Sequence, residues 1–119
     1  MHTEKKKTVL GTWCLSLAAV LSLIFSVHAP AAGTYDLQWR YANGTTTDRT
    51  GTVSVGGSAQ ATNISFAGTG AWATWALSPV VSVDLEAGNN SIQLIAETSG
   101  GLANIDWMEV TGQSPSPGE

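Results

Sequence analysis

The chain has 119 residues, with nine acidic and five basic side chains and a formal net charge of −4 at pH 7. This length allows at most one ordinary domain. The acidic balance leaves too little cationic surface to attract nucleic acid or anionic lipid, so we expect neither as a partner.

The first 31 residues have the pattern of a secretory leader. A basic triplet, Lys5–Lys7, precedes an apolar run over 9–27, and small residues at Ala29 and Ala31 form an A-x-A cleavage pattern. We therefore predict cleavage after Ala31 and a secreted, extracellular protein without a membrane segment. An uncleaved membrane anchor is the alternative, because the run is almost long enough to span a bilayer.

The rest of the chain consists of short strand-like runs separated by turns. Residues 34–41 alternate large apolar side chains with polar ones, which is the two-residue period of a half-buried strand. The later runs are rich in β-branched and aromatic residues and cover 52–55, 64–66, 72–77, 81–86, 92–97 and 105–110. No segment keeps a helical period, and turn signals recur about every 8–12 residues. We predict an all-β, two-sheet sandwich over 34–112 and a linker-like, Pro/Ser-rich tail over 113–119.

Loss of the leader would remove the side chains on which most enzymes depend. Cys14 and both histidines lie in the leader, and the only basic residues after it are Arg40 and Arg49. No thiol, imidazole or lysine amine would then remain as nucleophile or general base. Two carboxylates can hydrolyse a glycosidic bond, but Asp84 and Glu86 have the spacing of a solvated strand face. We therefore predict no enzymatic activity.

The tryptophans after the leader are suited either to core packing or to stacking on the apolar faces of sugar rings. Trp39, Trp75 and Trp107 share the apolar phase of their segments, so we expect them in the core. Trp72 is out of phase with Trp75 and lies beside the glycine-rich loop 68–70. Exposed aromatic side chains on loops often serve recognition, so Trp72 is a candidate ligand platform, with core packing as the alternative.

The last strand carries a second candidate. Asn104 and Asp106 share its polar phase, and Asn104 follows the glycines at 100–101. Its carboxamide can both donate to and accept from sugar hydroxyls. Alternatively, the side chain caps its own turn.

These residues occur in an order and spacing that resemble a known family. The matching segments are 39–44 (Trp-Arg-Tyr-Ala-Asn-Gly), 48–49, 53–57, 70–75 (Gly-Ala-Trp-Ala-Thr-Trp), 83–92 and 104–107 (Asn-Ile-Asp-Trp). Together they resemble the family 6 and family 35 carbohydrate-binding modules over residues 35–111. The resemblance implies a jelly-roll β-sandwich, attached to a secreted glycoside hydrolase, that binds a polysaccharide without cleaving it.

The resemblance also implies roles for individual residues. Trp72 looks like the sugar-stacking platform, and Asn104 like the amide that binds sugar hydroxyls. Tyr41 and Arg49 would line the site in the family 35 manner. Asp106 resembles a ligand of the family's structural Ca²⁺, a hard cation that prefers oxygen ligands.

The chain departs from this family at its start. Family members carry several strands before the segment that matches Tyr35, and these supply acidic calcium ligands and a second aromatic platform. Here the predicted leader runs directly into Thr34 and Tyr35. We therefore expect a sandwich that lacks its first strands. The alternative to sugar binding is a degenerate, secreted sandwich with a structural role only.

Overall fold

The computed structural model describes residues 5–11 and 21–118. Its strands are β1 (Lys5–Gly11), β2 (Ser22–Ala29), β3 (Gly33–Ala42), β4 (Gly51–Val55), β5 (Ser58–Ile64), β6 (Ala76–Leu77), β7 (Val81–Leu85), β8 (Gly88–Ala96), β9 (Asn104–Gln113) and β10 (Ser116–Pro117). Over the described residues we find no helix with the length and apolar character needed to cross a membrane.

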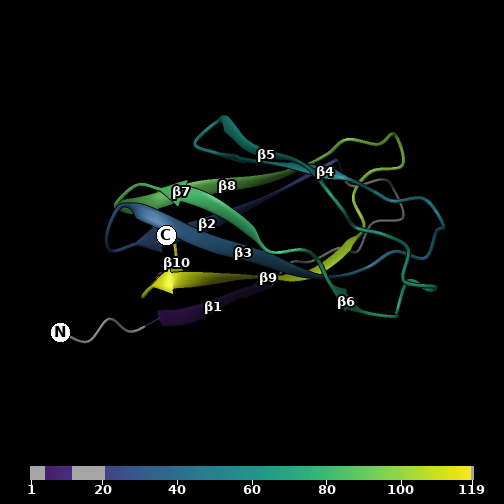
Figure 1. The fold of residues 1–119 in the computed structure, drawn as a ribbon, viewed down its shortest axis with the longest axis horizontal. Coiled ribbons are helices and arrows are strands. Elements are labelled where there is room, and N and C mark those ends of the chain that lie inside the picture. Colours follow the sequence, from purple (N-terminus) through teal and green to yellow (C-terminus); the bar gives the residue numbers. More distant parts are fainter. Residues whose placement is uncertain (1–4, 12–20, 119) are drawn as a thin grey trace.

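Two antiparallel sheets form the molecule (Figure 1). One has the strand order β1-β9-β3-β6, with β7 also paired to β3, and the other has the order β10-β2-β8-β4-β5. Most pairings join strands that are distant in sequence, as in a sandwich built by crossovers between sheets. The predicted all-β sandwich is confirmed.

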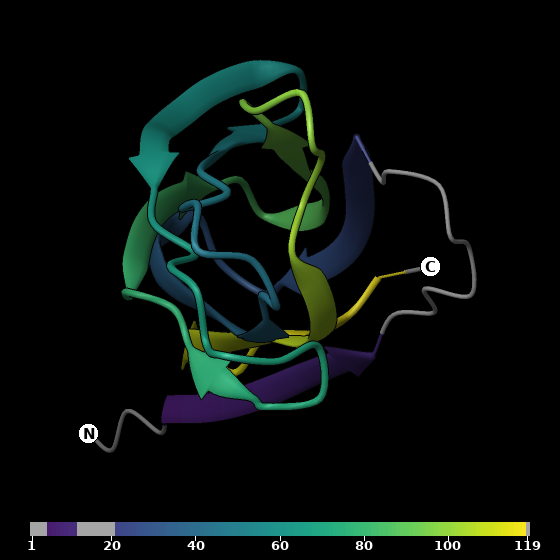
Figure 2. The ribbon, with the colours of Figure 1, turned by 90° about the vertical axis from the view of Figure 1, so that its right-hand side faces the viewer.

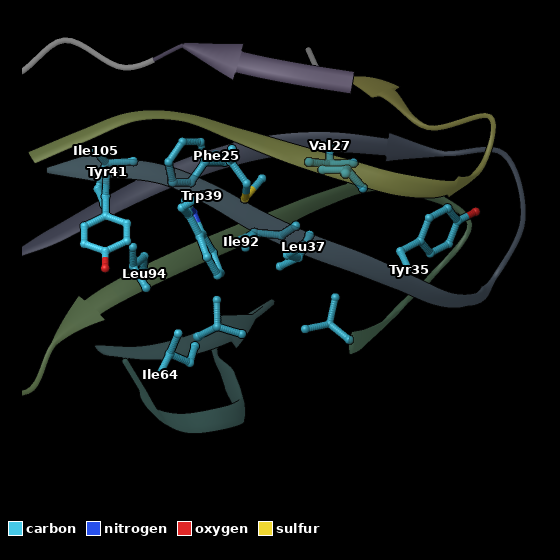
Figure 3. Close-up of a cluster of buried hydrophobic side chains, with 14 of the residues drawn as sticks. Phe25, Val27, Tyr35, Leu37, Trp39, Tyr41, Ile64, Ile92, Leu94 and Ile105 are labelled. Atoms are coloured by element: carbon cyan, nitrogen blue, oxygen red, sulfur yellow. The ribbon is translucent and has the colours of Figure 1, made fainter. Parts of the chain in front are cut away.

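The core lies between the two sheets and follows the alternation of the strands. Tyr35, Leu37 and Trp39 of β3 are at most 2% exposed. Ile92 and Leu94 of β8 meet them from the opposite sheet and are completely buried (Figure 3). Burial of such side chains is the main source of stability in a fold of this size, and it fixes which faces of β3 and β8 point inward.

β2 is an integral part of this core. Phe25 is 4% exposed and Val27 is completely buried (Figure 3). Ala29 is completely buried as well. The strand pairs with β8 along one side and with β10 along the other. The Tyr35 hydroxyl also donates to the Ala31 carbonyl at 2.7 Å, which ties the connection after β2 to the sandwich.

The sandwich therefore extends beyond the range 34–112 expected from the sequence. It includes β1 and β2, which lie in the predicted leader and precede the segment at which the sandwich was expected to begin, and β10, which lies in the tail predicted to be linker-like. A leader and a buried strand both require a run of apolar residues, so composition does not separate them. Cleavage after Ala31 would remove β2, and the position of the cut stays a prediction.

β9 contains an irregularity that changes which side chains face inward. Ile105 and Trp107 pair with consecutive residues of β3, so Asp106 has no partner across the ladder and forms a β-bulge. The extra residue reverses the phase of the strand. As a result Met108 is completely buried, whereas Trp107 is only half-buried. The expectation that Trp107 belongs to the core was wrong for this reason.

Candidate functional site

Three loops gather at one end of the sandwich. They are 43–50 between β3 and β4, 65–75 between β5 and β6, and 97–103 between β8 and β9. This loop end lies on the right in Figure 1 and faces the viewer in Figure 2. It carries three of the side chains that the sequence analysis selected, Trp72, Arg49 and Asn104.

Trp72 is the prominent aromatic side chain of the loop end, with 43% of its surface exposed. Its indole ring lies against the backbone of Gly44. The guanidinium carbon of Arg49 is 5.1 Å from the ring centroid, within cation–π range. The amide of Asn104 donates to the Trp72 carbonyl at 3.4 Å. The structure thus brings the three predicted residues together around one exposed ring.

Arg49 is fixed by backbone acceptors and not by an acid. Its Nη1 donates to the carbonyls of Gly100 and Leu102, at 2.5 and 3.4 Å. Within residues 21–118, Arg40 pairs with Asp106, and no carboxylate is paired with Arg49. The positive charge beside Trp72 is therefore not neutralised by a carboxylate within the described chain.

Tyr41 lies beneath this surface. It is 6% exposed, its hydroxyl donates to the Ala67 carbonyl at 3.0 Å, and its ring meets Phe66 edge-on at 5.1 Å. Burial, with a smaller contribution from the negative charge of Asp48, raises the pKa of the Tyr41 hydroxyl. Tyr41 supports the loop 65–75 from the core side, so it is not placed to touch a ligand in this conformation.

Trp75 is exposed, contrary to the expectation that it packs in the core. The chain turns at this point, with the amide of Thr74 donating to the Ala71 carbonyl at 3.2 Å. The alternation of a strand therefore does not apply until β6 begins. The Trp75 ring is 37% exposed and lies 5.0 Å from the guanidinium carbon of Arg40.

Asp106, the predicted calcium ligand, forms a salt bridge with Arg40, and both side chains are about one-third exposed. No group of three or more His, Cys, Asp or Glu side chains is placed to hold a metal ion within residues 21–118. A divalent cation at Asp106 would lie next to a guanidinium, which repels it. The described residues therefore do not fit a calcium ion at Asp106, and metal removal tests the calcium binding that the resemblance implies.

Two further residues of the loop end, Asn43 and Gly44, belong to the matching segment 39–44, but the sequence assigned them no individual role. Asn43 is completely buried, and its amide binds both the 43–50 loop and the 65–75 loop. The Asn-Gly pair signals a turn, but nothing in it shows that the asparagine points inward. Only the structure shows that this turn lies next to Trp72 of the 70–75 motif.

Comparison with known proteins places this fold in a defined class. Residues 22–106 match a family model described as CBM13-like, from the CBM13 domain of α-galactosidase. The chain is 46% identical over 85 residues to an exo-β-D-glucosaminidase of Amycolatopsis orientalis, covering 71% of the chain and 8% of the relative. It is 41% identical over 92 residues to endo-1,4-β-xylanase B of Cellvibrio japonicus, covering 76% of the chain and 15% of the relative.

Solved structures that match this chain include family 35 carbohydrate-binding modules. A family 35 carbohydrate-binding module from Cellvibrio japonicus superimposes with a TM-score of 0.79 at 38% identity, covering 86% of this chain and 72% of that one. A family 35 module in complex with a disaccharide that contains glucuronic acid superimposes with a TM-score of 0.78 at 37% identity, covering 86% and 73%.

The sandwich and these matches define a non-catalytic carbohydrate-binding module. The chain belongs to the family 35 carbohydrate-binding modules, which confirms the resemblance seen in the sequence. It spans only 8% and 15% of the two curated relatives described above. The reactions in their names belong to those whole proteins.

Proposed function

We propose that this module binds an acidic polysaccharide at its loop end, with Trp72 as the stacking platform. The observation that carries the proposal is the 43% exposure of a tryptophan held in place by three neighbours, Gly44, Arg49 and Asn104. An exposed indole is costly to hydrate, and a sugar ring presents an apolar C–H face that can cover it. The exposed tryptophan is thus matched to a carbohydrate ligand.

Asn104 supplies hydrogen bonding next to the platform. Its side chain is half-buried, and the one hydrogen bond it makes in the described chain is the long contact to the Trp72 carbonyl. The amide oxygen and the second N–H remain able to accept from and donate to hydroxyl groups. A sugar stacked on Trp72 would place such hydroxyls at the rim of the ring.

Arg49 is the reason for proposing an acidic sugar. The chain carries a net charge of −4, so a polyanion would be repelled by most of its surface. Arg49 offers a local positive charge without a carboxylate partner in the described chain, and guanidinium–carboxylate hydrogen bonds are among the strongest in proteins. The related module bound to a glucuronic acid-containing disaccharide is consistent with this choice.

The wider role follows from the relatives. Both curated relatives described above are named as glycoside hydrolases, and the matching region is a small part of each. We infer that this module is exported from the cell and holds a glycoside hydrolase, as a partner module of a longer protein, against its polysaccharide. The leader-like pattern at the start of the chain supports export, and retention of β2 in the sandwich requires that any cleavage fall before Ser22.

The test is affinity electrophoresis of the full chain through gels with and without soluble polysaccharides. We expect a glucuronic acid-bearing xylan to retard the wild type more than an unsubstituted xylan does, and Trp72→Ala to be retarded much less than the wild type. Trp75→Ala is the matched control, because it removes an exposed tryptophan outside the proposed contact and should leave the retardation unchanged. If folded wild-type protein is retarded by no polysaccharide, the chain is a structural sandwich and the proposal is wrong.

A further inference from the structure

The indole of Trp72 rests on a glycine that leaves no room for a side chain. A Cβ atom built on Gly44 would lie 2.5 Å from both Cδ1 and Nε1 of the ring and 2.7 Å from Cγ. Real Cβ contacts essentially never fall below 3.0 Å. The three similar distances show that the added atom would meet the five-membered ring itself and not a single atom at its tip.

Backbone conformation is not the reason for glycine at this position. Gly44 is absent from the glycines with positive φ, which include Gly56, Gly57 and Gly70. An alanine could therefore adopt the local backbone without strain. The close approach of Trp72 is the feature that only glycine permits.

The backbone under the ring is held firmly, so it is the ring that would move. The buried Asn43 amide accepts from the backbone amide of Thr45 at 3.0 Å, and it donates to the carbonyls of Thr47 and Phe66 at 2.9 Å each. Its own backbone carbonyl accepts from the amide of Thr69 at 2.8 Å. Buried hydrogen bonds of this kind are costly to break.

The exposed ring is restrained much less. Asn104 donates one long hydrogen bond to the Trp72 main-chain carbonyl, Arg49 makes a cation–π contact with the indole, and 43% of the side chain is exposed. A contact of that type contributes little at an exposed site. The steric clash caused by a side chain at position 44 would therefore be relieved by rotation of the Trp72 ring and not by a shift of the loop.

We propose that Gly44 is a positioning residue that sets the orientation of the Trp72 platform and thereby the affinity for the ligand. This inference rests on the proposed function, because it assumes that Trp72 contacts the sugar. It predicts that Gly44→Ala weakens polysaccharide binding by about tenfold or more, which is the scale of one lost aromatic contact. The melting temperature should change little.

The experiment is a double-mutant cycle with wild type, Gly44→Ala, Trp72→Ala and the double variant. Polysaccharide affinity and thermal melting are measured for each, and the indole N–H signal of Trp72 is followed by NMR after assignment by its loss in Trp72→Ala. Gly33→Ala is the matched control, because its added Cβ would meet no atom within 4 Å and Gly33 has no positive φ.

We expect Gly44→Ala to shift the Trp72 signal and to lose affinity, with no further loss when it is added to Trp72→Ala. Wild-type affinity in Gly44→Ala, or an equal loss in both backgrounds, would overturn the inference. If Gly44→Ala fails to fold, the inference requires the double variant to fold, because the clash is with the indole that the double variant lacks. Failure of both variants to fold would overturn the inference. If the wild type binds no polysaccharide, the proposed function fails, and an unshifted Trp72 signal would separately reject the positioning role.

Discussion

The interior of the sandwich and its loop end use tryptophan in opposite ways. Trp39 is completely buried and meets Phe66 edge-on at 5.9 Å, within a core to which both sheets contribute. Trp72 is 43% exposed and is held by a glycine, a guanidinium and one long hydrogen bond. Stability therefore depends on the interior and recognition on the loop end, and substitutions should separate the two.

The largest expected effect is on the interior. Phe25→Ala in the full chain should lower the free energy of unfolding by about 3–5 kcal/mol, because it removes a ring that is 4% exposed in the core. Ile24→Ala on the same strand is the control; its side chain is 67% exposed, so a change within about 0.5 kcal/mol is expected. Urea unfolding measures both. Equal, small effects would show that β2 is not part of the folded module.

A smaller effect is expected from the charge at the loop end. Arg49→Gln should weaken binding of a glucuronic acid-containing oligosaccharide about tenfold, because a charged hydrogen bond to the carboxylate is lost. Binding of the neutral counterpart should change much less. Titration calorimetry measures both. Arg40→Gln is the control, because the Arg40 guanidinium forms a salt bridge with Asp106 and a cation–π contact with Trp75. This substitution should alter neither affinity. Equal loss for acidic and neutral ligands would contradict the assigned role of Arg49.

A still smaller effect is expected on the pH dependence of stability, through Glu97 at the start of the loop 97–103. Hydrogen bonds from the Thr52 hydroxyl and the Asn63 amide lower the pKa of Glu97 below its usual 4.5. A lowered folded-state pKa contributes stability above the unfolded value, and that contribution is lost as pH falls through the folded pKa. Wild type should therefore lose more stability below about pH 4.5 than Glu97→Gln does. Melting from pH 7 to pH 3 measures this, with Glu86→Gln as an exposed control; parallel curves for wild type and Glu97→Gln would rule it out.

No effect is expected from calcium removal. The Asp106 carboxylate already has Arg40 as a counter-charge, and no suitable ligand cluster surrounds it within residues 21–118. A chelator should leave the melting temperature unchanged. A clear drop, restored by added Ca²⁺, would show that this module keeps the metal that its family resemblance implies.

Regular alternation made most of the fold predictable. The strand at β3 and the overall two-sheet class followed directly from the two-residue period. The prediction of burial was wrong at Trp107, because the bulge at Asp106 exchanges the inward and outward faces of the residues that follow it. The sequence does not reveal this bulge. The prediction of burial was wrong at Trp75 because the segment before β6 is a turn and has no strand phase.

The candidate site was predictable in part. Trp72, Arg49 and Asn104 were selected from the sequence and lie together in the structure. Tyr41 was selected with them but is buried, because its strand phase points it into the core under Phe66. β2 was not predicted as a strand, because its apolar residues lie in a run that also satisfies the composition of a leader, and the leader itself stays a prediction.

The most direct test of the central claim is a backbone NMR titration with a glucuronic acid-containing xylo-oligosaccharide. It asks whether the loop end, and not another face of the sandwich, receives the ligand. The account predicts shifts in 43–50, 69–73 and 100–104, with Arg49, Trp72 and Asn104 among the largest. Shifts confined to the opposite end, at the turns 56–57 and 86–88, or spread over the outer sheet faces, would contradict it.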